Sequence, residues 1–299
     1  MSPLLLQQGS LWPALVGRSR HALACGAMQP IETTQKIVHD AGVDFLVRSL
    51  SSLARKEEAK ERNERAAKPV NPFLPPEPDL FVADISESHF ALLNKFNVIA
   101  HHLLIVTRRF IDQEALVDLD DFQALAACMA QVDGLALYNA GAVAGASQPH
   151  KHLQLVPLPL APGGPPVPVD PLFASVSGRT GILRVPGLPF RHAFAWVETG
   201  WFGETETAAV QLNRLYRNLL SALGLEPVAR AGAWRPGPYN LLATRRWMLL
   251  VPRSKEMYDS VPVNSLGFAG SMFVRDRTQM QVLKRAGPMT VLKAVSLPD

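Results

Sequence analysis

His150-Lys151-His152-Leu153-Gln154 is the stretch that decides both the fold and the chemistry expected of this chain, and it opens a strand predicted to run to Leu158. Alternate side chains of a strand lie on the same face, so the two histidines and Gln154 point one way while the leucines face the core. Three polar side chains on one face are costly to bury without a ligand or partners. The pattern therefore predicts a functional site on the polar face of this strand.

A loop of small residues leads directly into this strand, from Asn139 through Gly141, Gly145 and Ser147 to Pro149. Small residues allow main-chain N–H groups to approach an anion closely. An imidazole nitrogen next to such a loop can attack phosphorus and form a phosphoramidate, which divides one difficult displacement into two easier ones. We therefore expect nucleotidyl transfer with His152 as the nucleophile.

Two other interpretations of the histidine strand stay open. His-x-His is also a metal-ligand spacing, although zinc needs three or four ligands and glutamine is a poor one. Two histidines and a glutamine can also form a purely structural polar network. We expect no metal site here.

Composition sets wide limits. The chain has 299 residues, 47% of them hydrophobic, which is enough for a large core in one or two domains. The net charge of +4 suits an anionic substrate but decides nothing, and no basic run with interleaved aromatic residues indicates nucleic acid. The two cysteines, Cys25 and Cys128, indicate neither a disulfide nor a thiolate zinc site. The sequence has no run of about 18 to 20 consecutive apolar residues, so we expect no membrane span. We expect a cytoplasmic protein.

Apolar periodicity predicts the elements around the histidine strand. Residues 31–53 begin with helical spacing and turn into a strand at Phe45–Arg48. Further strands are expected at 80–85, 135–138, 194–197 and twice within 96–107, where the turn Ala100-His101-His102 gives both histidines a surface role. Helices are expected at 118–131 and at 204–223, the second with Val210, Leu215, Leu219 and Leu223 on one stripe and Gly224 as its stop.

The sequence also predicts two related halves. Residues 157–171 hold seven prolines and Gly163-Gly164, which is typical of a surface linker or lid. Beyond it, Tyr239–Ala243 repeats the pattern of Phe96–Ala100, and the apolar strand that follows each repeats as well. Such self-similarity indicates the internal duplication of one α+β unit.

The octapeptide Ser147–Gln154 resembles the active-site strand of diadenosine tetraphosphate (Ap4A) phosphorylases, also called ATP adenylyltransferases. Further blocks resemble that family in the expected order from about residue 31 to the C-terminus: Phe45–Arg48, Asn71–Phe73, Asn94–Asn97, Asn240–Thr244, Trp247–Arg253 and Asn264–Gly270. The resemblance implies a histidine-triad-like α+β fold of the galactose-1-phosphate uridylyltransferase branch, a duplicated unit with an antiparallel sheet and packed helices. Residues 1–170 would carry the histidine strand, and residues 171–299 would complete the nucleotide site.

The resemblance also implies a reaction. His152 would attack the α-phosphate of Ap4A and expel ATP, and inorganic phosphate would then take the adenylyl group from His152 to give ADP. Gln154 would bind the transferring phosphoryl oxygens, and His150 would orient the nucleophile. No cofactor is expected to be tightly bound, with Mg²⁺ only as a companion of the polyphosphate. The expected partners are these small nucleotides and phosphate, not nucleic acid or membrane, and the chain is expected to be a monomer or a small homo-oligomer.

The family pattern further implies residues that bind nucleotide or phosphate. These are Lys56, Asn94, Lys95, Asn139, Gly145, Ala146, Ser147, Gln148, Asn264, Ser265, Leu266, Ser271 and Arg275. The sequence departs from the pattern at Ser271 and Arg275, where a methionine and a lysine are expected, and at Ala140, where serine is common. Two alternative functions remain: a nucleotidyltransferase for a nucleotide sugar, with a uridylyl intermediate, and a nucleotide sensor without catalysis.

Overall fold

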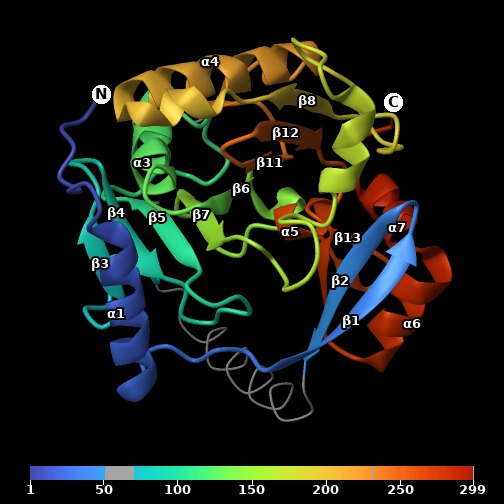
Figure 1. Ribbon diagram of the computed structural model, residues 1–299, viewed down its shortest axis with the longest axis horizontal. Helices are drawn as coiled ribbons and strands as arrows, with labels where there is room; N and C mark the ends of the chain where they lie inside the picture. Colours follow the sequence, from blue (N-terminus) through green and yellow to red (C-terminus); the bar gives the residue numbers. More distant parts are fainter. Residues whose placement is uncertain (51–70, 231, 299) are drawn as a thin grey trace.

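The computed structural model describes residues 1–50, 71–230 and 232–298 (Figure 1). An eight-stranded antiparallel sheet forms its centre, with the strands in the order β3-β4-β5-β7-β6-β11-β12-β8. Their bounds are β3 Phe81–Asp84, β4 His89–Leu93, β5 Leu103–Thr107, β7 His152–Pro157, β6 Gly134–Asn139, β11 Tyr239–Ala243, β12 Trp247–Pro252 and β8 Ala193–Trp196. The mixed α+β fold expected from the sequence is confirmed.

The sheet is continuous between the two predicted halves because β6 pairs with β11. Asn139 lies opposite Asn240 in this pairing, and Ala136 lies opposite Ala243. Both strands are buried at every position, in agreement with sequences that are apolar apart from the two asparagines. The boundary expected after residue 170 stays a prediction.

Two helices cover one part of the large sheet, α3 (Leu119–Met129) and α4 (Thr205–Ala222), and α4 runs along the edge of the molecule in Figure 1. Gly224, with φ +64°, follows α4, as the sequence predicts. In the predicted apolar stripe of α4, Leu219 and Leu223 are buried and Leu215 packs against the first apolar core, whereas Val210 is exposed. The buried side chains of this helix are Ala208, Ala209, Leu212, Tyr216, Leu219 and Leu220.

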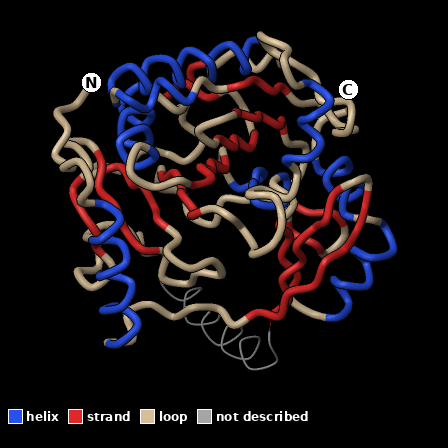
Figure 2. Tube along the Cα trace, viewed as in Figure 1, coloured by secondary structure: helices blue, strands red, loops and turns tan. Residues whose placement is uncertain are grey.

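A smaller sheet joins β1 (Thr33–Asp40), β2 (Val43–Leu50) and β15 (Ser271–Val274), with β15 parallel to β2. Figure 2 shows it beside helical segments at one side of the molecule, which Figure 1 labels α6 (Arg277–Ala286) and α7 (Pro288–Val295). The helix expected at the start of residues 31–53 is wrong. The chain forms a hairpin instead, because Ala41 and Gly42 both adopt the positive φ values of a two-residue hairpin turn.

The strand expected at 96–100 is also wrong. β4 ends at Leu93, and the N–H of Asn94 donates to the carbonyl of His102, which closes the hairpin loop before β5 begins. Within this loop the side chain of Asn97 donates to the carbonyl of Ile99 at 2.9 Å. The two hairpins β4-β5 and β11-β12 are present. The alignment of Phe96–Ala100 with Tyr239–Ala243 fails, however, because only the second of these segments forms a strand.

The proline-rich segment 157–171 is exposed at Pro162, Gly163 and Gly164 and packs against the protein on either side of them. Its residues Leu160, Val167 and Val169 are buried in the second apolar core. Asp170 at its end accepts hydrogen bonds from the indole N–H of Trp247 at 2.9 Å and from Arg246 at 3.0 Å. The expectation of a surface linker or lid therefore agrees with the exposure of Pro162, Gly163 and Gly164, whereas Leu160, Val167 and Val169 belong to the core.

The remaining elements are short or lie at the edges. Helix α1 (Leu11–Ala24) packs on β3 and β4. The others are η1 Ala142–Ala144, η2 Asp170–Val176, η3 Thr199–Gly203, β9 Val228–Arg230, β10 Ala233–Arg235, β13 Met257–Tyr258, β14 Val261–Pro262 and α5 Ser265–Phe268. The helices that the structure describes are each too short or too polar to span a membrane.

Candidate active site

Strand β7 separates its side chains as the sequence predicts. His152 pairs with Val106 of β5, and Gln154 pairs with Leu104 of β5 and Leu137 of β6. Leu153 belongs to the first apolar core on the opposite face. His150 lies just before the strand, in an isolated bridge with Asp112. The expected polar face is therefore present.

The ring of His152 is held by the main chain. Its Nδ1 lies 2.8 Å from the carbonyl oxygen of His150, which can only accept, so Nδ1 carries the proton. The second nitrogen, Nε2, makes no hydrogen bond within the described part of the chain. The residue is 5% exposed, and burial lowers the pKa of His152 to about 4. The result is a neutral imidazole with a lone pair on Nε2.

His150 is fixed from two sides. Its Nε2 donates to the carbonyl of Thr107 at 2.9 Å, and its Nδ1 accepts from the amide of Asn71 at 3.0 Å. Phe73 packs against both rings, at centroid distances of 5.7 Å for His150 and 5.1 Å for His152. His150 thus orients the neighbouring imidazole through its main-chain carbonyl, while its side chain anchors that stretch of backbone.

Gln113 holds the start of β7 and was not singled out from the sequence. Its side-chain oxygen accepts from the N–H of His152 at 2.8 Å, and its nitrogen donates to the carbonyls of Asn139 and His152 at 2.9 and 3.2 Å. The pairing of β6 with β7 ends at Leu137 and Gln154, and beyond that point the side-chain amide of Gln113 satisfies the main chain of His152. It joins Asn139, at the end of β6, directly to the histidine.

The surface role expected for His102 is wrong. His102 is 4% exposed, and its Nε2 lies 2.9 Å from Oε1 of Gln154. Its Nδ1 lies 3.3 Å from Nδ2 of Asn94. His101 has a polar contact as well, at 3.0 Å from Oγ of Ser19. His102 occupies the position directly before β5, so the cross-strand register with β7 brings it to Gln154.

We call residues 139–148 the anion loop. Gly145 has φ +87°, and a Cβ there would lie 2.7 Å from the carbonyl oxygen of Val263, so only glycine fits. The N–H of Gly145 and of Ala146 donate within the loop, at 2.9 and 3.1 Å. The N–H groups of Ser147 and Gln148 make no hydrogen bond among the described residues. They are the donors that the loop leaves available to an anion.

A buried group of hydrogen bonds joins the anion loop to the second half of the chain. Oδ1 of Asn139 accepts from Nδ2 of Asn240 at 2.8 Å and from the N–H of Ser265 at 2.9 Å. Arg253, 2% exposed, donates to the carbonyl of Ala144 at 3.2 Å and to Oδ1 of Asn240 at 2.6 Å. The predicted site residues Asn139, Gly145 and Ser265 are therefore brought together.

The turn that begins α5 holds the other predicted residues of this segment. Asn264 caps the helix by accepting from the N–H of Leu266 at 3.0 Å. The hydroxyl of Ser265 is buried without a hydrogen-bond partner in the described chain. Buried hydroxyls are usually paired, so this one is a candidate for contact with a ligand.

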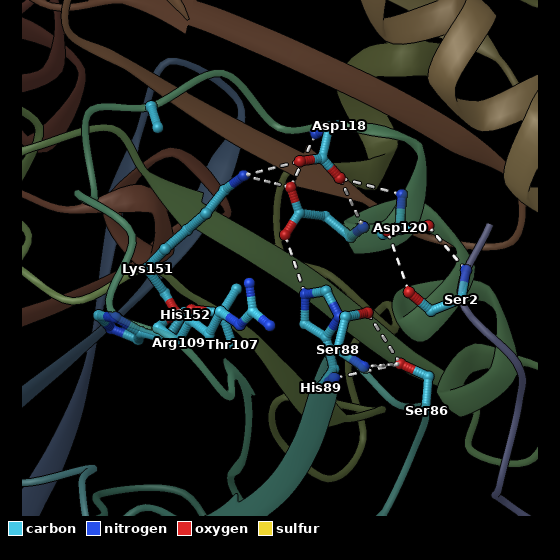
Figure 3. A network of polar contacts seen from close by, with 12 residues as sticks. Ser2, Ser86, Ser88, His89, Thr107, Arg109, Asp118, Asp120, Lys151 and His152 are labelled. Atoms are coloured by element: carbon cyan, nitrogen blue, oxygen red, sulfur yellow. Dashed lines mark hydrogen bonds and ion pairs between the residues drawn. The ribbon is translucent and has the colours of Figure 1, made fainter. Parts of the chain in front are cut away.

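Lys151 extends to the opposite face from the histidines (Figure 3). Its ammonium donates to the carbonyl of Leu116 at 2.8 Å and forms an ion pair with Asp121, which in turn lies 3.0 Å from Nε2 of His89. Burial raises the pKa of Asp121, but the charges of Lys151 and His89 outweigh it and lower the pKa to about 2. A buried ionic group thus supports the peptide between the two histidines.

The other predicted binding residues come from further segments of the chain. Lys95 forms an ion pair with Glu77 at 2.9 Å, and Asn94 contacts His102. Ser271 begins β15 in the small sheet and accepts a hydrogen bond from Arg48. Arg275 follows β15 and is exposed. Lys56 lies outside the described residues. Contact of these residues with nucleotide stays a prediction.

One group of possible metal ligands occurs among the described residues, formed by His21, Cys25 and Asp79 within 4.8 Å of one another. Nε2 of His21 already lies 2.7 Å from Oδ1 of Asp79. The group is on α1 and the loop before β3, not on β7. The expectation that the histidine strand binds no metal stays a prediction.

Comparison with known proteins gives a consistent result. The chain matches the family models "Ap4A phosphorylase N-terminal domain" over residues 1–175 and "ATP adenylyltransferase C-terminal domain" over residues 186–298. It is 26% identical to diadenosine 5',5'''-P1,P4-tetraphosphate phosphorylase 2 of Saccharomyces cerevisiae over 294 residues, 88% of this chain and 83% of that protein. It is 27% identical to Protein APA1 of the same yeast over 277 residues, 82% and 80% of the two proteins.

The crystal structure of yeast Ap4A phosphorylase Apa2 has the same fold. Its TM-score with this chain is 0.78 at 21% identity, over 98% of this chain and 99% of that one. Apa2 has also been solved in complex with AMP and with Ap4A, with TM-scores of 0.78 and 0.76.

Proposed function

This chain belongs to the family of Ap4A phosphorylases and ATP adenylyltransferases, and on that premise we propose that it cleaves diadenosine 5',5'''-tetraphosphate with inorganic phosphate to give ATP and ADP, through an adenylyl group carried on His152. The chain is a nucleotidyltransferase of that family. Its substrate and the covalent intermediate are the proposal.

The single observation that carries the proposal is the hydrogen bond between Nδ1 of His152 and the carbonyl of His150, 2.8 Å long. This bond leaves the lone pair on Nε2, which is the atom that must attack phosphorus. Burial lowers the pKa of His152 to about 4, so the ring is neutral at pH 7. The same carbonyl stabilises the positive charge that the ring acquires when Nε2 becomes bonded to phosphorus.

Two in-line displacements follow from this arrangement. In the first, Nε2 of His152 forms a bond to the α-phosphorus of Ap4A while the bond from that phosphorus to the bridging oxygen breaks, and ATP leaves with the electron pair. In the second, an oxygen of inorganic phosphate forms a bond to the same phosphorus, the N–P bond breaks, and the lone pair returns to Nε2. The products are ATP and ADP, and no proton is lost from Nδ1.

The surrounding groups support the binding of the polyphosphate. The available N–H groups of Ser147 and Gln148 face no acceptor among the described residues, and oriented N–H donors stabilise developing phosphoryl charge. The hydrogen bonds from Asn240 and Ser265 to Asn139 support the proposal that residues 171–299 complete the nucleotide site.

A bound Mg²⁺ does not fit the carboxylates beside the anion loop. Asp112 and Glu114 both pair with Arg235, at 2.9 and 2.5 Å. They are therefore engaged by a cation of the protein. We propose that any Mg²⁺ is held by the oxygens of the polyphosphate, and an assay with and without a chelator tests this.

Turnover tests the proposed function. The protein with Ap4A and phosphate is expected to release ATP and ADP in equal amounts, and His152→Asn is expected to abolish release while the protein stays folded. A nucleotide sugar with a uridine base tests the alternative transferase. Binding of Ap4A by the wild-type protein without any turnover would instead identify a sensor.

A further inference from the structure

A line of hydrogen bonds runs from the main chain of the β4-β5 loop to Gln154. The N–H of Phe96 donates to Oδ1 of Asn94 at 3.1 Å, and Nδ2 of Asn94 lies 3.3 Å from Nδ1 of His102. Nε2 of His102 lies 2.9 Å from Oε1 of Gln154. His102 is 4% exposed, so these contacts are shielded from water.

The direction of every bond in this line is determined by its first donor. A main-chain N–H can only donate, so the oxygen of Asn94 must face Phe96 and its NH₂ must face His102. Nδ1 of His102 therefore accepts, and the single proton of the neutral ring sits on Nε2, facing Gln154. Reversal at any one step would place two donors or two acceptors against each other.

The ring has only one proton to place. Burial lowers the pKa of His102 to about 4 and outweighs the hydrogen bond to Gln154, which acts in the opposite direction. At pH 7 His102 is therefore neutral, and its Nε2–H must meet the oxygen of the Gln154 amide, not its nitrogen.

We infer that His102, set by Asn94, is a positioning residue that holds the Gln154 amide with both N–H bonds directed away from His102 and toward the transferring phosphoryl group. Nε2 of Gln154 makes no hydrogen bond among the described residues, so both of its donors are available to that group. A free glutamine could equally present its oxygen, which would repel the phosphoryl oxygens. The identity of the transferring group in this inference rests on the proposed function. The orientation of the Gln154 amide does not depend on it.

The orientation is measured first, on the full-length protein without nucleotide. Nitrogen-15 chemical shifts of the histidine rings distinguish the two neutral tautomers, and His102→Phe identifies the His102 signals by their loss. We expect the proton on Nε2 of His102 at pH 7. A proton on Nδ1, or a doubly protonated ring, would overturn the inference whether or not the protein turns over Ap4A.

Kinetics then tests the consequence. In His102→Phe the rate of single-turnover adenylyl transfer is expected to fall by about 10- to 100-fold, comparable with the loss of one oriented donor to a developing charge. The dissociation constant for AMP is expected to change by less than about threefold, because only the reacting group loses its donor. An unchanged transfer rate would contradict the inference.

A second variant guards against misfolding of the first. Asn94→Asp keeps the shape of the side chain but replaces the NH₂ by an oxygen, which demands a proton on Nδ1 of His102. We expect the nitrogen-15 signals of His102 to shift to the other tautomer or to the charged ring. If the ring moves to the Nδ1–H tautomer and adenylyl transfer does not slow, Gln154 is not oriented in this way. Absence of turnover in the wild-type protein would refute the proposed function and leave the tautomer result standing.

Discussion

Replacement of Lys151 by methionine is expected to destabilise the protein strongly although this residue faces away from the site. Lys151 and Asp121 are each 1% exposed, and their ion pair is completed by the carbonyl of Leu116. Lys151→Met keeps the length of the side chain and leaves the carboxylate of Asp121 in the core. Removing one member of a buried ion pair costs about 3 to 5 kcal/mol. Because His89 remains 3.0 Å from Asp121, we expect a loss at the lower end of that range.

The pH dependence of this loss has a definite sign. Burial raises the pKa of Asp121, but Lys151 and His89 together lower it to about 2, below its ordinary value of 3.8. The ion pair therefore stabilises the folded protein above pH 3.8, and this contribution disappears as the pH falls through 2. Without Lys151 the carboxyl group becomes easier to protonate in the folded state. The difference between variant and wild type is then expected to shrink toward low pH.

Urea denaturation followed by far-UV circular dichroism measures the loss. The matched control is the double variant Lys151→Met/Asp121→Asn, which removes both charges and is expected to recover part of the lost free energy of unfolding. A loss below about 1 kcal/mol, the range of exposed ion pairs, or a double variant that is less stable than the single one, would refute the argument that a buried pair supports β7.

Two further substitutions and one pH profile test other parts of the site. Gly145→Ala is expected to lower the free energy of unfolding by about 1 to 3 kcal/mol, because φ is +87° and the new Cβ would lie 2.7 Å from the carbonyl oxygen of Val263. The same substitution is expected to weaken AMP binding in titration calorimetry, and an unchanged affinity would contradict this. The adenylylation rate is expected to stay level at neutral pH and to fall only as His152 is protonated near its pKa of about 4, so an inflection at 6.5 in a stopped-flow pH profile would argue against the buried neutral ring. Arg253→Met is expected to cost more than about 3 kcal/mol, because charge-assisted hydrogen bonds to Ala144 and Asn240 are lost together; thermal unfolding at the wild-type temperature would contradict it.

The features that depend on local periodicity were predictable. The alternation along β7 placed His152 and Gln154 opposite Leu153, and the register with β5 confirms it. Gly224 stopped α4 as expected, since helix ends have strong local signals. In contrast, the predicted helix before Phe45 failed because spacing alone does not separate a short helix from a hairpin strand. The turn Ala41-Gly42 was the signal that could have shown it.

The residues that complete the site come from segments far apart in sequence. Gln113, Asn71 and His102 reach the histidine strand from a loop, a connector and the start of β5. No local pattern marks an amide or an imidazole as the partner of a strand that follows it by 30 residues or more. The ion pair of Lys151 could not be predicted either, because its partner Asp121 lies far away in the sequence, in the first turn of α3. These contacts depend on register and packing, which a single sequence does not contain.

Incubating the protein with Ap4A labelled in the adenosine, in the absence of phosphate, tests the central claim most directly. The account predicts one adenylate per chain, joined to Nε2 of His152 through an acid-labile N–P bond that peptide mass spectrometry locates and that added phosphate discharges as ADP. Label on any other residue, or steady release of products with no bound adenylate in rapid-quench samples, would contradict it.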